Sequence, residues 1–70
     1  MITNVKFELM MIVVNQVKSD ITEMQKLRVY SAKKAAKMLA YVDADKDGIE
    51  NYRNNGMRIS EIADLVSQLT

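Results

Sequence analysis

The chain of 70 residues contains no cysteine and no histidine. Without cysteine it can form neither a disulfide nor a thiolate site for a metal. Without histidine it lacks the most common general base and the most common ligand of transition metals. Catalytic sets of the Ser-His-Asp or Cys-His kind are therefore excluded. No glycine-rich phosphate-binding motif is present either. We therefore expect a protein that is not an enzyme and has no certain cofactor.

Proline is also absent, and the only two glycines are Gly48 and Gly56. Residues that break helices are therefore confined to one region. The longest apolar run, LMMIVV at residues 9–14, is far shorter than the roughly 18 residues that a membrane-spanning helix needs. We therefore expect no membrane segment. The lack of cysteine agrees with a cytoplasmic protein.

Helical periodicity dominates what is present. The sequence predicts an all-α fold, a single small domain over residues 1–70 with helices at about 3–28, 31–42, 48–54 and 60–69. Three of these are main helices of a bundle, and the segment at 48–54 is a short helical turn. Candidate N-terminal caps are Thr3 or Asn4, Ser31 and Ser60. Residues 5–9 also alternate as a strand does, so a strand at the start of the chain stays open.

Apolar residues recur at spacings of three and four along each predicted main helix. In the first helix these are Met10, Val13, Val14, Val17, Ile21, Met24 and Leu27. In the second they are Ala32, Ala35, Ala36, Leu39 and Val42, and in the last Ile62, Leu65, Val66 and Leu69. The long first helix has more apolar surface than one short helix can cover, so both a monomer and a dimer stay open.

A run of basic residues without an acid occupies the middle of the chain. We call Lys26, Arg28, Lys33, Lys34 and Lys37 the basic set. One interpretation is an ordinary solvated face. The other is a surface for a protein partner, to which Met10 and Val14 of the first helix would add apolar contacts.

The segment DADKDGIEN, residues 43–51, has carboxylates at alternate positions followed by a glycine. This pattern resembles the calcium loops of EF-hand proteins and dockerins, in which positions 1, 3, 5, 7, 9 and 12 supply oxygen ligands. The resemblance implies weak calcium binding, with a dissociation constant on the order of 10⁻⁴–10⁻³ M. The implied ligands are Asp43, Asp45, Asp47, the Ile49 carbonyl, Asn51 and Asn54.

The same segment can equally be an acidic turn between two helices. Asp47 and Glu50 have the spacing of a capping box, and acids at a helix N-terminus are favoured by the helix dipole. This alternative requires no metal.

A second resemblance involves two stretches, VYSAKKAAKML at residues 29–39 and IENYRNNG at residues 49–56. They are similar to the first two helices of MerR and excisionase DNA-binding domains. The resemblance implies a helix-turn-helix in which Ala36 and Leu39 lie in the core and Ile49 and Tyr52 pack. It also implies that Gly56 begins the wing.

Net charge bears on the choice of partner. The formal charge is only +1, and the would-be recognition helix opens with acids that phosphates repel, so the sequence favours a protein partner over a nucleic acid. We therefore expect a small regulatory or inhibitory protein that binds a protein partner, or a second copy of itself, through a helical face. Calcium binding and DNA binding are the two alternatives.

Overall fold

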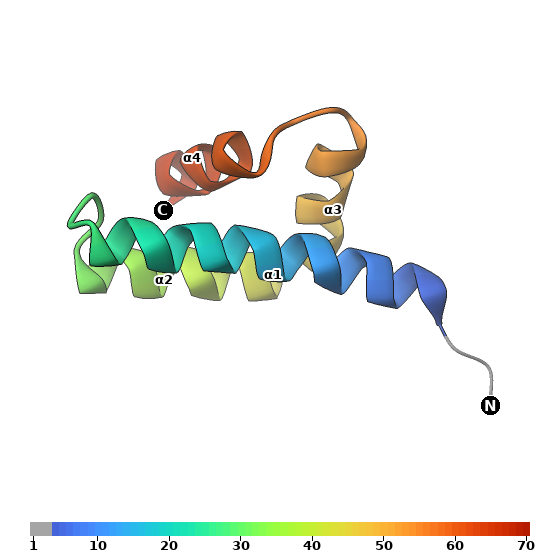
Figure 1. Cartoon of the computed structure of the whole chain (residues 1–70), viewed down its shortest axis with the longest axis horizontal. Coiled ribbons are helices and arrows are strands. Elements are labelled where there is room, and N and C mark those ends of the chain that lie inside the picture. Colours follow the sequence, from blue (N-terminus) through green and yellow to red (C-terminus); the bar gives the residue numbers. More distant parts are fainter. Residues whose placement is uncertain (1–3) are drawn as a thin grey trace.

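The computed structural model describes residues 4–70, which form four α-helices (Figure 1). Helix α1 spans Val5–Lys26, α2 Ala32–Ala44, α3 Lys46–Asn54 and α4 Ile59–Leu69. No strand occurs within residues 4–70, so the predicted all-α bundle is confirmed and the strand at residues 5–9 is wrong. The predicted start of the first helix at Thr3 lies outside the described residues.

Helix α1 is the longest element and determines the elongated shape. Its N-terminal cap is Asn4, whose side-chain oxygen accepts a hydrogen bond from the Phe7 N–H at 3.0 Å. The radius of gyration is 12.3 Å, compared with about 11 Å for a compact domain of this length. In Figure 1 the first turns of α1 extend beyond the ends of α2 and α3, which accounts for the excess.

The C-terminus of α1 is closed by a residue in the left-handed conformation. Arg28 has φ of 64°. Its N–H donates to the Gln25 carbonyl at 3.0 Å, and the Val29 N–H donates to the Met24 carbonyl at 2.9 Å. These two hydrogen bonds define a Schellman motif, whose left-handed position is usually occupied by glycine.

Replacing Arg28 with glycine is expected to raise the free energy of unfolding by roughly 0.5–1 kcal/mol, because glycine has no Cβ to clash at positive φ. Urea denaturation of the native protein and the Arg28→Gly variant measures this gain. As a control, Lys26→Gly changes a residue with helical backbone in the last turn of α1 and should lower the stability. An Arg28→Gly variant less stable than the native protein would contradict the expectation.

Helices α2 and α3 are separated by a single non-helical residue, Asp45. The sequence therefore predicted the end of the second helix too early, at residue 42, and the start of the third helix too late, at residue 48. Helix α2 continues through Asp43 and Ala44, and α3 includes Gly48 in its first turn. Asp47 lies in that first turn, where the helix dipole favours a negative charge, so the aspartates do not interrupt the helices.

The start of α4 also differs from the prediction. Arg58, and not Ser60, occupies the cap position. The Arg58 N–H donates to a Glu61 carboxylate oxygen at 3.1 Å. Ile59 is half-buried against the core, and this packing favours a helix that begins at Ile59.

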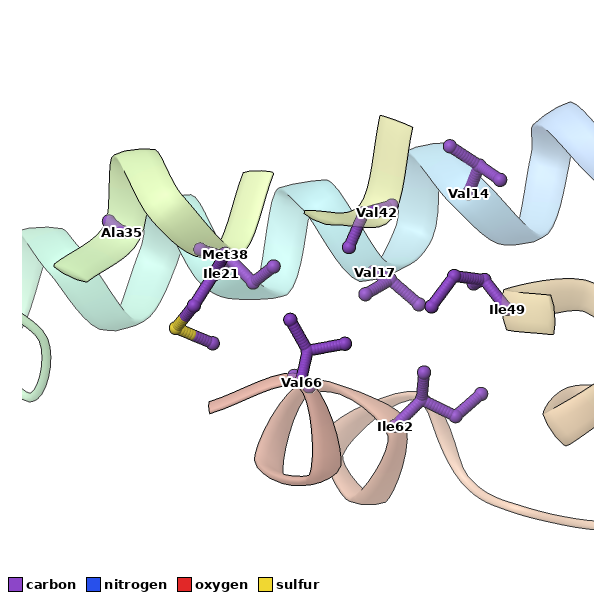
Figure 2. Packing of buried hydrophobic residues seen from close by; sticks show 10 residues of the cluster. Val14, Val17, Ile21, Ala35, Met38, Val42, Ile49, Ile62 and Val66 are labelled. Atoms are coloured by element: carbon purple, nitrogen blue, oxygen red, sulfur yellow. The ribbon is translucent and has the colours of Figure 1, made fainter. Parts of the chain in front are cut away.

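All four helices contribute to one apolar core (Figure 2). Its buried members are Val14, Val17, Ile21, Ala35, Met38, Val42, Ile49, Ile62, Ala63 and Val66. Figure 2 shows Ile49 of α3 pointing toward Val17 of α1, with Ile62 and Val66 approaching from α4. No charged or polar side chain within residues 4–70 is buried.

The core confirms the centre of the predicted apolar stripe of α1 but corrects those of α2 and α4. In α2, Met38 is buried whereas Ala32 and Ala36 are exposed. In α4, Ala63 is buried whereas Leu69 is exposed. The buried face of each of these helices is rotated about the helix axis relative to the predicted face. The reason is that α2 and α4 pack against α1 and against each other, and the spacing of apolar residues alone does not specify this packing.

Candidate protein-binding surface

The first two turns of α1 carry large apolar side chains that the core does not use. We call residues 5–12 the projecting segment. Val5 is 59%, Phe7 52%, Leu9 54% and Ile12 53% exposed. Val5, Leu9 and Ile12 follow i, i+4, i+7 spacing and share one side of the helix, while Phe7 lies about half a turn away. The segment is therefore apolar on two sides.

The two apolar residues predicted to bind a partner behave differently. Val14 is fully buried in the core and presents no surface, so this prediction was wrong. Met10 is half-buried and lines a hollow beside the projecting segment. The exposed residues Val5, Leu9 and Ile12 lie on the side of α1 opposite to the predicted core stripe, so the sequence-based prediction did not include them. Their own 4–3 spacing is the signal that identifies them.

A groove separates the projecting segment from α3. Its larger hollow, of about 560 Å³, is lined by Lys6, Asp47, Gly48, Glu50, Asn51 and Asn54. An adjoining hollow of about 170 Å³ is lined by Asn4, Lys6, Phe7, Met10, Asp47 and Glu50. The two hollows share three lining residues, so we treat them together as the α1–α3 groove.

The two walls of the groove differ in chemistry. The α1 wall offers the apolar side chains of Phe7 and Met10 with Lys6. The α3 wall offers two carboxylates, Asp47 and Glu50, with two amides. Among residues 4–70 the only ion pair joins Lys18 to Asp43, so the carboxylates of the α3 wall form none. The α1 wall is thus apolar with one positive charge, and the α3 wall is negatively charged.

The predicted calcium ligands are spread over several environments. Asp43 lies in the last turn of α2 and accepts hydrogen bonds from the Lys18 ammonium at 3.1 and 3.2 Å. Asp45 lies at the joint, and Ile49 lies inside α3 with its side chain in the core. Of the six, only Asp47, Asn51 and Asn54 line the groove.

The predicted loop conformation is therefore replaced by helix. Within residues 4–70 no three acidic side chains gather where they could hold a metal ion. Calcium binding itself stays a prediction.

The members of the basic set differ in exposure. Lys26, Arg28, Lys33 and Lys37 are exposed. Lys34 is half-buried, and its ammonium donates to the Ser67 carbonyl oxygen at 2.7 Å, which joins α2 to α4. Lys34 therefore has a structural partner.

Ala36, implied as a core residue by the resemblance to a helix-turn-helix, is exposed.

Tyr30, in the connection between α1 and α2, makes another contact with α4. Its hydroxyl lies 3.4 Å from an Asp64 carboxylate oxygen. Burial, and next the negative charge of Asp64, raise the pKa of Tyr30 above the usual 10.0. The folded state therefore holds the phenolic proton more tightly than the unfolded chain does.

Stability from Tyr30 should be fully present below pH 10 and be lost as the pH rises through the raised pKa. We expect the free energy of unfolding to fall more steeply above pH 10 in the native protein than in Tyr30→Phe, which cannot ionise. Urea titrations at several alkaline pH values measure both slopes. Equal slopes would show that the folded state does not disfavour the phenolate.

No protein-family model, curated protein or solved structure matches this chain. None of the helices within residues 4–70 combines the length and the apolar character needed to cross a membrane. The functional argument therefore depends on the surface itself.

Proposed function

We propose that this chain is a small non-enzymatic regulatory protein that binds a helical segment of a protein partner in the α1–α3 groove. One observation carries the proposal. An α1 wall with Phe7, Met10 and Lys6 faces an α3 wall whose carboxylates Asp47 and Glu50 form no ion pair within the described residues. The absence of cysteine supports a cytoplasmic setting.

The partner's chemistry follows from the two walls. An amphipathic helix laid in a groove buries its apolar side chains and exposes its polar ones, which is a common mode of peptide recognition. Here the apolar side chains would contact Phe7 and Met10. Lysine or arginine on the flank facing α3 would meet Asp47 and Glu50. Such charge complementarity contributes more to specificity and association rate than to affinity.

Two designed peptides test the proposal. Both carry the same leucine stripe, one with lysine and the other with glutamate on its polar face. We expect the lysine peptide to shift the amide NMR signals of residues lining the groove and to bind at least about tenfold more tightly than the glutamate peptide.

A pair of variants locates the preference. Asp47→Asn combined with Glu50→Gln should abolish the difference between the peptides. Asp64→Asn removes an exposed carboxylate on α4 and should leave the difference intact. Equal binding of both peptides, or shifts confined to surfaces away from the groove, would reject the proposal.

Calcium binding and DNA binding remain the alternatives. Asp47, Glu50, Asn51 and Asn54 all line the groove, which gives a cation several oxygen atoms on one side. Saturable amide shifts confined to residues 43–54 at up to roughly millimolar calcium, not reproduced by magnesium, would support that alternative. A steeply salt-dependent interaction with duplex DNA would support the other.

A further inference from the structure

We infer that two copies of this chain pair antiparallel through the outer side of α1, with each Leu9 facing Ile12 of the second copy. This inference concerns the side of the projecting segment away from the groove. It therefore goes beyond the proposed function and leaves the groove free. We call Val5, Leu9 and Ile12 the seam.

The seam has the 4–3 spacing by which two helices pair along their length. Its three side chains are each more than half exposed. The next positions on the same stripe are Gln16, Ser19 and Glu23, all exposed and polar. The apolar part of this stripe is thus limited to the first two turns of α1.

The residues further along the stripe decide the orientation. In a parallel pair identical positions meet, so the Glu23 carboxylates of the two copies would face each other, which is unfavourable. An antiparallel pair centred between Met10 and Met11 places Leu9 opposite Ile12 twice and Val5 opposite Gln16. It also brings Glu8 near Asn15 of the second copy, and each Glu23 lies beyond the overlap. In each copy the core side of α1, which carries Val14 and Val17, faces away from the seam.

A second copy fits the seam because this arrangement is self-complementary about a twofold axis, the commonest symmetry of protein dimers. The surface between the two helices carries no charge from residues 9 to 16, so no partner of opposite charge is required. The overlap covers only about three turns of each helix, so it buries less than the roughly 1,200 Å² of stable complexes. The dimer is therefore a weak one that forms at high micromolar to millimolar concentration.

Sedimentation equilibrium of the whole chain tests self-association. The average mass should rise toward twice that of the monomer as the concentration increases to about 1 mM. Ile12→Glu should remain a monomer across that range. Val29→Glu replaces an equally exposed apolar residue in the α1–α2 connection and should associate as the native protein does.

Cysteine cross-linking tests the orientation, because the native chain has no cysteine. Val5→Cys and Gln16→Cys should each form little disulfide alone, since identical residues lie roughly 16 Å apart along the antiparallel helices. An equal mixture of the two should form the mixed disulfide readily. Cross-linking of each variant with itself but not in the mixture would indicate a parallel pair and overturn the inference.

The proposal about the groove and the inference about the seam can be tested separately. Ile12→Glu should still bind the lysine peptide, and the Asp47→Asn, Glu50→Gln variant should still dimerise. A native protein that stays monomeric at about 1 mM would overturn the inference without touching the groove. Binding of the lysine peptide to the seam would also overturn the inference, because the seam would then accept a foreign helix and not a second copy of this chain.

Discussion

Ile49→Ala is expected to lower the free energy of unfolding by roughly 2–4 kcal/mol. Ile49 is the only buried residue of α3, and its side chain points into the core (Figure 2). Truncation removes buried methyl groups and leaves a cavity beside Val17. A domain of this size has only roughly 3–5 kcal/mol of net stability, so the variant should be close to unfolding at room temperature.

Ile12→Ala is the matched control, since it makes the same chemical change at an exposed position of α1. Its stability should change by less than about 0.5 kcal/mol. Ile49→Val, which removes a single methylene, should cost roughly 0.5–1.5 kcal/mol. Urea denaturation monitored by circular dichroism measures all three variants in dilute solution, where the weak dimer is absent. Equal stability of Ile49→Ala and Ile12→Ala would mean that α3 does not depend on its buried isoleucine.

Gly56→Ala has the second largest expected effect, a loss of roughly 1–2 kcal/mol. Gly56 has φ of 95° and follows α3. Its N–H donates to the Arg53 carbonyl at 3.0 Å, and the Met57 N–H donates to the Tyr52 carbonyl at 3.1 Å. This is the same Schellman motif that ends α1. No neighbouring atom obstructs a Cβ at Gly56, so the cost arises from the backbone conformation alone.

Thermal unfolding of Gly56→Ala and Gly56→Asn tests whether the positive φ at Gly56 causes the loss of stability. Asparagine tolerates positive φ better than alanine and should recover part of the loss. Asn55→Ala, at a neighbouring exposed position with φ of −88°, should have little effect. A Gly56→Ala variant as stable as the native protein would mean that the chain reaches α4 by another backbone route.

The comparison of Gly56 with Arg28 shows what sequence alone could and could not predict at helix ends. A glycine after a helical pattern indicates a terminus, and α3 does end two residues before Gly56. At Arg28 no residue type marked the left-handed position, yet the end of α1 was predicted within two residues. There the serine at Ser31 gave the signal, and its hydroxyl does accept from the Lys34 N–H at 3.1 Å.

The joint at Asp45 was harder to predict for a physical reason. Three aspartates and a glycine disfavour a helix locally. Burial of Ile49 and partial burial of Tyr52 outweigh that preference, so α3 forms through packing and begins earlier. The same effect explains Met38, which spacing placed outside the predicted face of α2.

The candidate binding surface was predictable only in part. The sequence indicated excess apolar area on the first helix and a concentration of acids near residue 47. It could not indicate that Phe7 and Met10 would lie opposite Asp47 and Glu50, because some 40 residues separate them along the chain. That juxtaposition depends on how α1 and α3 cross.

The attachment of α3 by one buried side chain has a consequence for motion. An element with few buried groups opens locally at a lower free energy than the whole molecule unfolds. Amide hydrogens of α3 should therefore exchange with solvent before those around Val17 and Ile21 in the centre of α1. Because α3 is one wall of the groove, local opening of α3 would alter this wall before the centre of α1 unfolds. A helix bound there as proposed should therefore slow amide exchange in α3.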